Sequence, residues 1–177
     1  DPITKRNLPA WNTFEPGSVM KSFLVASAIN EGVINDQTII DCENGQRRIG
    51  KYTIHDVNKK GKLDISGVLR FSSNIGASKI IERISNKKYY SYLKSLGFGT
   101  KTNIKLPGEA KGILVAPEKW SQIQAANISF GQGMSTTSIQ LAKALSIVAN
   151  GGVYIEPYLI KSITNSEGKI LFKNQNR

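Results

Sequence analysis

Residues 14–21 read Phe14-Glu15-Pro16-Gly17-Ser18-Val19-Met20-Lys21, a break in regular structure followed at once by the start of a helix. Pro16 and Gly17 interrupt the chain, and apolar residues spaced for one helix face continue to residue 30. Residues three positions apart share one side of a helix, so the Lys21 amine can reach the Ser18 hydroxyl. A serine becomes an effective nucleophile when a base takes its proton, and a buried lysine can be that base. The stretch therefore predicts a nucleophile–base pair or, alternatively, an ordinary capping serine at a helix start.

The spacing Ser-x-x-Lys alone is a weak signal, because Ser85…Lys88 and Ser91…Lys94 repeat it. Both repeats lie in a Lys- and Tyr-rich helical stretch without a preceding glycine break, so we interpret them as solvated surface. Of these pairs, only Ser18…Lys21 follows a Pro-Gly break, and this context distinguishes it.

A second polar segment, Ser72-Ser73-Asn74, interrupts two runs of apolar residues with helical spacing. We expect two short helices joined at a polar turn. Ser72 and Asn74 could project together into a cleft, where Ser72 would relay a proton and Asn74 would hold an amide. The alternative is that Ser73 or Asn74 simply caps the following helix.

Together, Ser18-Val19-Met20-Lys21 and Ser72-Ser73-Asn74 resemble the first two motifs of the penicillin-binding proteins and β-lactamases. The residues of these motifs are most similar to those of the class B penicillin-binding proteins, which are monofunctional transpeptidases. Within that class, they most resemble the division-specific septal type. Two further segments match that subfamily, at residues 106–112 and at residues 129–142, the latter including Ser129-Phe130-Gly131-Gln132-Gly133. The resemblance runs from about residue 14 to residue 157, with every element in family order.

The third motif of that family, Lys-Thr-Gly or Lys-Ser-Gly, does not occur in this sequence. The resemblance therefore implies one partial transpeptidase domain over residues 1–177, truncated at both ends. The expected fold is mainly α with small β hairpins (α+β), the helical portion of the transpeptidase fold with most of the central sheet missing. We expect an exposed apolar face where that sheet would pack, and a fragment that is inactive or weakly active because one oxyanion donor is lacking.

The resemblance also implies the chemistry and the site. Ser18, Lys21, Ser72 and Asn74 would be catalytic, in a serine acyl-enzyme route that cross-links peptidoglycan stem peptides and is trapped by β-lactams. Substrate binding would involve Ser73, Gly131, Gln132 and Gly133, although the two glycines also suit a tight turn before a helix. No cofactor or metal is expected. The parent protein would work with division-machinery membrane proteins at the extracytoplasmic face of the membrane, through an anchor not in this chain.

Two alternatives remain open. A β-lactamase or β-lactam sensor of the same fold would need a glutamate that activates a deacylating water. Glu118 lies in the right general region, but its Pro-Glu-Lys-Trp context does not resemble that loop. A noncatalytic scaffold of the division machinery, with the motifs as remnants, is the alternative from another class.

Composition excludes several other classes. The net charge of +11 first suggests a nucleic-acid binder, but the lysines are dispersed and no nucleic-acid motif occurs. The charge fits a surface beside anionic lipids and wall polymers, or an ordinary solvated surface. One cysteine, Cys42, and one histidine, His55, allow neither an internal disulfide nor a zinc cluster. No apolar run is long enough to span a bilayer and no signal peptide is recognised.

Apolar periodicity predicts helices near residues 18–31, 65–72, 74–84, 87–96, 118–126 and 137–150, the last capped by Thr136 or Thr137. Residues 153–164 and 169–172 alternate like the strands of a hairpin. Residues 38–41 and 48–54 could form another small β pair.

Overall fold

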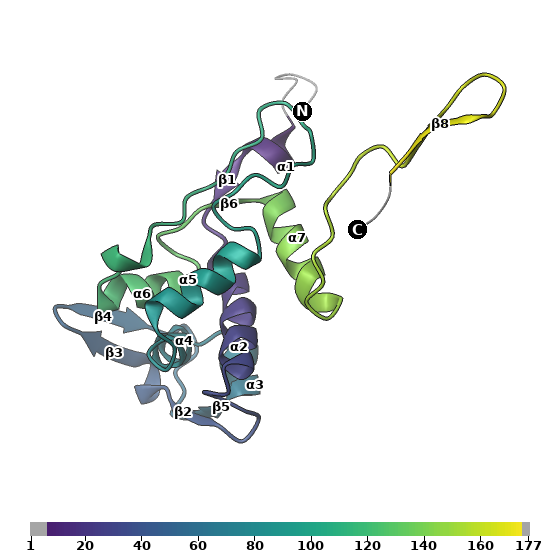
Figure 1. Ribbon diagram of the computed structural model, residues 1–177. Helices are drawn as coiled ribbons and strands as arrows, with labels where there is room; N and C mark the ends of the chain where they lie inside the picture. The colour runs from purple at the N-terminus through teal and green to yellow at the C-terminus, as the bar shows by residue number, and fades with distance from the viewer. Residues whose placement is uncertain (1–6, 175–177) are drawn as a thin grey trace.

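Helix α2 (Met20–Asn30) lies at the centre of the helical body in the computed structural model, which describes residues 7–174 (Figure 1). It packs against α3 (Ile65–Arg70), α4 (Asn74–Ile81), α5 (Asn86–Ser95) and α6 (Gln122–Ser129). Apolar side chains from these helices form one core that includes Met20, Phe23, Leu24, Ile75, Ile80, Leu93 and Ala126. The helix that follows Ser18 is thereby held in a fixed place.

Side-chain oxygens cap the starts of the helices around α2. Each accepts a hydrogen bond from the backbone N–H three residues further on, which satisfies one of the free donors at a helix start. The capping residues are Asp64 for α3, Ser73 for α4, Ser85 for α5, Ser121 for α6 and Thr137 for α7 (Ser138–Ala149). The cap predicted at Thr136 or Thr137 is therefore Thr137, where a capping box with Gln140 completes the turn.

The strands of the described residues pair into two-stranded antiparallel sheets. They are β1 (Thr13–Phe14) with β6 (Thr136–Thr137), β2 (Ile39–Asp41) with β5 (Lys62–Asp64), β3 (Gln46–Ile49) with β4 (Tyr52–His55), and β7 (Ser162–Thr164) with β8 (Ile170–Lys173). Helices with small antiparallel sheets are the α+β arrangement that the sequence predicts. The predicted pairing of residues 38–41 with 48–54 is wrong, because β3 and β4 close on each other as a hairpin and β2 takes β5 as its partner.

Several helix boundaries also differ from the predictions. Ser18 lies in a short 3₁₀ turn, η1 (Gly17–Val19), that leads into α2. The helix predicted from residue 118 is a 3₁₀ turn, η3 (Pro117–Lys119), followed by α6, because extended backbone at Trp120 and Ser121 separates the two. A further 3₁₀ turn, η2 (Glu43–Gly45), and a short helix, α1 (Leu8–Trp11), were not predicted.

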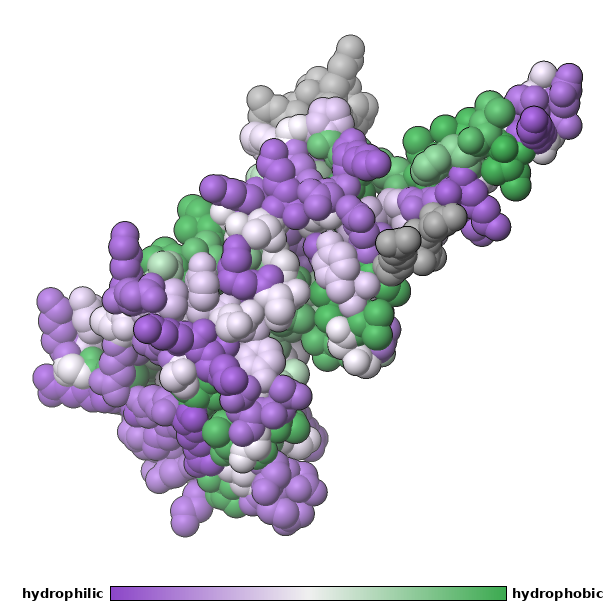
Figure 2. Space-filling model, viewed as in Figure 1, coloured by the Kyte–Doolittle hydropathy of each residue, from purple (hydrophilic) through white to green (hydrophobic). Residues whose placement is uncertain are grey.

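Beyond α7, the chain leaves the helical body as an extended arm that ends in the β7–β8 hairpin (Figure 1). The predicted strand over residues 153–164 is confirmed only at its end, because residues 153–161 form no regular structure. The arm exposes apolar side chains to solvent (Figure 2), namely Val153, Tyr154, Ile155, Tyr158, Leu159, Ile160, Ile163, Ile170, Leu171 and Phe172. The apolar face expected from the sequence was one on which a central sheet would pack, and that expectation stays a prediction.

Candidate active site

The 3₁₀ turn η1 presents Ser18 at the surface, directly above the first turn of α2. Gly17 adopts a left-handed backbone with φ of +61°, which a residue with a side chain rarely adopts. Ser18 is exposed, whereas Lys21 is 2% exposed, and the Lys21 Nζ lies 3.1 Å from the Ser18 Oγ. The Pro-Gly break therefore places an accessible hydroxyl beside a buried amine.

The Lys21 amine is surrounded by four oxygen atoms. Besides the Ser18 Oγ, its Nζ lies 2.6 Å from the Ser72 carbonyl oxygen, 2.9 Å from the Ser72 Oγ and 2.8 Å from the Asn74 Oδ1. Carbonyl and amide oxygens only accept hydrogen bonds, whereas hydroxyls can donate. A neutral amine would give its two N–H groups to the Ser72 carbonyl and the Asn74 Oδ1. Its lone pair would then face a hydroxyl, and this arrangement suits a base that takes a proton from Ser18.

The turn between α3 and α4 aims both groups of the second motif at Lys21. Ser72 has φ of +53°, a left-handed conformation that is uncommon for serine and is often found at functional sites. The Asn74 Nδ2 donates to the His55 carbonyl oxygen at 3.1 Å, so the Oδ1 of the same amide faces the lysine. The structure thus brings Ser18, Lys21, Ser72 and Asn74 together.

Ser73 points the other way. It is 1% exposed, its hydroxyl donates to the Asp56 Oδ2 at 2.5 Å, and its Oγ accepts the Gly76 N–H as the cap of α4. The predicted contact of Ser73 with substrate does not fit this position, because the side chain lies on the buried side of the turn. The alternative stated for this segment, a helix cap, applies to Ser73, while its two neighbours face the lysine.

Asp56 is the residue of the site that the sequence did not reveal. Its carboxyl group is buried, and its Oδ1 accepts the backbone N–H groups of Asn74 at 2.6 Å and Ile75 at 3.0 Å, in addition to the Ser73 contact. One side chain at the end of β4 therefore holds the whole turn. The sequence offers no local signal for this, because Asp56 lies 18 positions before Asn74 and the contact depends on how β4 packs on α4.

Burial lowers the proton affinity of the Lys21 amine. Loss of contact with water lowers the pKa of the Lys21 amine from its ordinary value of 10.5 to about 8, because the charged form is disfavoured away from water. The negative charge of Asp56 opposes this and raises the pKa. Lys21 can therefore be partly neutral near neutral pH.

The remaining predicted site residues lie after α6. Gly131 is buried and its carbonyl oxygen accepts the Gly17 N–H at 3.0 Å, so this residue touches the turn that carries Ser18. Gln132 and Gly133 are exposed, and the Gly133 N–H donates to the Glu15 Oε1 at 2.9 Å. Gly131 and Gly133 therefore contact the segment that precedes Ser18.

The side chains of Cys42 and His55 are not among the groups that surround the Lys21 amine. Cys42 is fully buried and contacts the Ser73 hydroxyl, and His55 contributes its backbone carbonyl to Asn74. Over residues 7–174, no three His, Cys, Asp or Glu side chains gather as a metal site would need. In the same part of the chain, no helix has the length and apolar character needed to cross a membrane.

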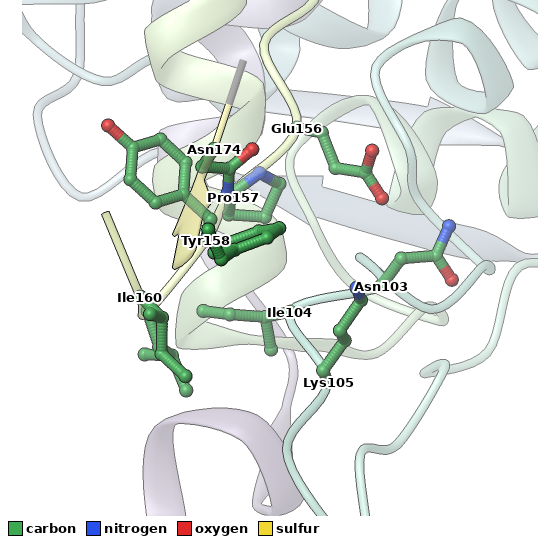
Figure 3. A pocket seen from close by; sticks show the side chains of 10 residues that line it. Asn103, Ile104, Lys105, Glu156, Pro157, Tyr158, Ile160 and Asn174 are labelled. Atoms are coloured by element: carbon green, nitrogen blue, oxygen red, sulfur yellow. The ribbon is translucent and has the colours of Figure 1, made fainter. Parts of the chain in front are cut away.

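A pocket of about 460 Å³ lies elsewhere, between the loop at residues 103–105 and the C-terminal arm. Figure 3 shows Ile104 and Lys105 on one side and Tyr158 and Ile160 of the arm on the other. None of the predicted site residues lines this pocket, so it is separate from the cluster around Lys21.

Comparisons with known proteins agree on one family. A family model for the penicillin-binding protein transpeptidase domain matches residues 3–177. The probable peptidoglycan D,D-transpeptidase PbpC of Pseudomonas aeruginosa is 38% identical over 160 residues, which cover 90% of this chain and 28% of that protein. Stage V sporulation protein D of Bacillus subtilis is 35% identical over 180 residues, covering 98% of this chain and 27% of that protein.

A solved structure is similar over the same region. Penicillin-binding protein 3 from Mycobacterium tuberculosis, complexed with aztreonam, superposes with a TM-score of 0.87 at 30% identity, covering 96% of this chain and 38% of that one. The chain spans about a quarter of the length of the two curated relatives.

Proposed function

The chain belongs to the penicillin-binding protein transpeptidase family, and on that premise we propose that it carries the reacting serine of a peptidoglycan D,D-transpeptidase. The observation that carries the proposal is the meeting of the Ser18 Oγ, the Ser72 Oγ and the Asn74 Oδ1 around one buried amine, the Lys21 Nζ. A nucleophilic hydroxyl, a base and a second hydroxyl within hydrogen-bond reach form an arrangement suited to acyl transfer through serine.

In the proposed reaction, the Ser18 Oγ attacks the carbonyl carbon of the penultimate D-alanine of a stem peptide, and its proton passes to the Lys21 Nζ. The Ser72 hydroxyl gives a proton to the departing D-alanine nitrogen and is reprotonated by the Lys21 ammonium. The C–N bond breaks and an ester to Ser18 forms. An amine from a neighbouring stem then attacks that ester, Lys21 takes the amine proton, and Ser18 regains its own as the cross-link forms.

A β-lactam would enter the same first step, because attack by Ser18 on its strained amide opens the ring and leaves a covalent ester. The complex of a similar protein with aztreonam supports this part of the proposal. The name of one relative, a sporulation protein, and the Ser-Ser-Asn form of the second motif support a role in septal wall synthesis. Such a role would place the parent protein at the extracytoplasmic face of the membrane with division-machinery partners.

The direct test is mass spectrometry of the chain after incubation with benzylpenicillin, followed by peptide mapping. We expect one penicilloyl group on the peptide containing Ser18 and none on those containing Ser85 or Ser91, which share the Ser-x-x-Lys spacing. Without a Lys-Thr-Gly or Lys-Ser-Gly sequence, acylation should be slower by about a hundred- to a thousandfold if one oxyanion donor is missing. The incubation therefore runs for hours at millimolar drug, and a longer protein that continues the chain through such a motif is tested in parallel.

The outcomes separate the alternatives. A stable adduct at Ser18 supports a transpeptidase. Rapid release of the penicilloate would favour a β-lactamase. If neither the chain nor the longer protein forms an adduct, the enzyme proposal fails. The remaining alternative is then a noncatalytic scaffold of the division machinery.

The acylation rate should depend on the protonation of Lys21. Only the neutral amine can accept the Ser18 proton, so the rate constant should fall about tenfold per pH unit below about pH 8 and level off above it. The rate constant is measured between pH 6 and pH 9.5 by mass spectrometry of reactions quenched at fixed times. A Ser18→Ala variant corrects for solvent hydrolysis of the drug. A rate that stays constant across this range would contradict the assignment of Lys21 as base.

A further inference from the structure

The segment that leads to Ser18 is bound along its length to a second segment more than a hundred residues later. Thr13 pairs with Thr137 and Phe14 with Thr136 in the β1–β6 sheet, where the two strands lie side by side (Figure 1). Glu15 then accepts the Gly133 N–H, and the Gly17 N–H donates to the Gly131 carbonyl oxygen at 3.0 Å. These contacts follow one another toward the nucleophile and end one residue before it.

The last contact is unusually close. A Cβ atom added to Gly131 would lie 2.1 Å from the Gly17 carbonyl oxygen and 2.5 Å from the Gly17 nitrogen. Distances below about 3 Å do not occur between such atoms, so either residue 131 or the Gly17 turn would have to move. Both partners are backbone atoms, which cannot turn aside as a flexible side chain can. Only glycine at residue 131 allows the two segments to lie this close.

The position of Gly17 determines the position of Ser18. Both residues belong to the three-residue turn η1, and Gly17 has the left-handed backbone that starts it. The Lys21 amine cannot follow a displaced Ser18, because it is buried and bound to Ser72 and Asn74 on another element. A shift of Gly17 would therefore lengthen the 3.1 Å separation between the Ser18 Oγ and the Lys21 Nζ.

We propose that Gly131 is a positioning residue for the nucleophile: its bare backbone, packed on Gly17, fixes the Ser18 hydroxyl at the Lys21 amine. The expected role of Gly131 in substrate binding is replaced by a role exerted through Gly17. The inference rests on the proposed function, because it concerns the same acyl transfer, and it adds a residue that touches neither substrate nor base.

The test compares Gly131→Ala with Gly151→Ala. Both glycines have φ of +79°, so alanine meets the same backbone strain at each, but a Cβ at residue 151 has nothing within 4 Å. The fluorescent penicillin Bocillin is used to resolve the non-covalent dissociation constant from the first-order acylation constant. We expect Gly131→Ala to lower the acylation constant about a hundredfold, since a displacement of about 1 Å can have that effect, with the dissociation constant changed less than about threefold. Gly151→Ala should leave both within about threefold.

A second variant adds no atom to the tight contact, in case Gly131→Ala does not fold. Glu15→Ala removes the carboxylate that holds the Gly133 N–H and should lower the acylation constant about tenfold. Glu15→Gln keeps an acceptor oxygen and should restore most of the rate. Equal losses in Gly131→Ala and Gly151→Ala, or an unchanged acylation constant in a folded Gly131→Ala, would overturn the inference. If Gly131→Ala does not fold, an unchanged acylation constant in Glu15→Ala would overturn it.

Hydrogen exchange at the Gly17 amide gives a readout that needs no activity. This amide should be protected in the parent chain and in Gly151→Ala, and should exchange faster in Gly131→Ala, because its acceptor is the Gly131 carbonyl. If neither the chain nor the longer protein forms an adduct, the proposed function fails, and exchange at the Gly17 amide still decides whether Gly131 holds the turn. Protection that persists in Gly131→Ala would show that the turn did not move and would refute the inference by itself.

Discussion

Methionine in place of Lys21 is expected to slow acylation of Ser18 by about a hundred- to ten-thousandfold, the range associated with loss of a general base. Methionine keeps an unbranched side chain of similar length, so the packing of this buried position is largely preserved. What it removes is the amine that lies 3.1 Å from the Ser18 Oγ and 2.9 Å from the Ser72 Oγ. Without it, the Ser18 hydroxyl loses the neighbouring amine that would take its proton. The measurement is the rate of penicilloyl adduct formation by intact mass spectrometry.

Lys88→Met is the matched control. Lys88 follows Ser85 with the same spacing, but its side chain is 55% exposed and pairs with Glu31 rather than with a serine hydroxyl. Its replacement should leave acylation unchanged, while Ser18→Ala defines the background with no nucleophile. A Lys21→Met chain that acylates within tenfold of the parent chain would exclude Lys21 as the base.

Alanine in place of Asp56 is expected to lower the free energy of unfolding by about 3 kcal/mol and the acylation rate by about ten- to a hundredfold. The substitution leaves the buried Ser73 hydroxyl and the N–H groups of Asn74 and Ile75 without the acceptor they now share. Each unsatisfied buried donor costs about 1–3 kcal/mol, and relaxation of the turn reduces the sum. The same relaxation moves Ser72 and Asn74 away from Lys21. Urea unfolding followed by circular dichroism measures the first effect, and adduct formation measures the second.

Asp64→Ala separates capping from positioning. Asp64 caps α3 through the Gly67 N–H, yet it contacts none of the groups around Lys21. Its loss should cost about 1 kcal/mol, as for an ordinary helix cap, and leave acylation unchanged. Asp56→Asn keeps the Oδ1 acceptor and should recover part of both losses. If Asp56→Ala and Asp64→Ala have equal effects on stability and neither changes acylation, Asp56 is a helix cap and nothing more.

The sequence predicted the parts of the site that are encoded locally. A helix start after Pro16 and Gly17 brings Ser18 to Lys21 across one turn, and this follows from helical geometry alone. The polar turn between two apolar runs likewise predicted that Ser72 and Asn74 would project together. Which side chain of Ser72-Ser73-Asn74 caps the helix could not be decided in advance, because serine and asparagine are both good caps. The left-handed backbone of Ser72 settles it by turning Ser73 inward.

Long-range contacts account for what the sequence did not predict. The Asp56 contact and the Gly131–Gly17 contact both join elements that are distant in the chain, and neither leaves a periodic pattern. The predicted strand pairing was wrong for a related reason. The strands are two to four residues long, so alternation fits several partners equally well, and the tight turn at residues 50–51 selected the β3–β4 hairpin instead.

The bond between Glu15 and Gly133 spans 118 positions, and this separation has a consequence for the order in which the protein matures during synthesis. When the ribosome has released residues 14–21, the serine and the lysine are already present, but nothing yet holds their turn in place. The anchoring segment emerges only about a hundred residues later, several seconds or more at ordinary elongation rates. A nascent or prematurely terminated chain would therefore contain the whole first motif and still lack its geometry. Competence to react with an antibiotic would thus appear late in biosynthesis, as a mark of a completed helical body.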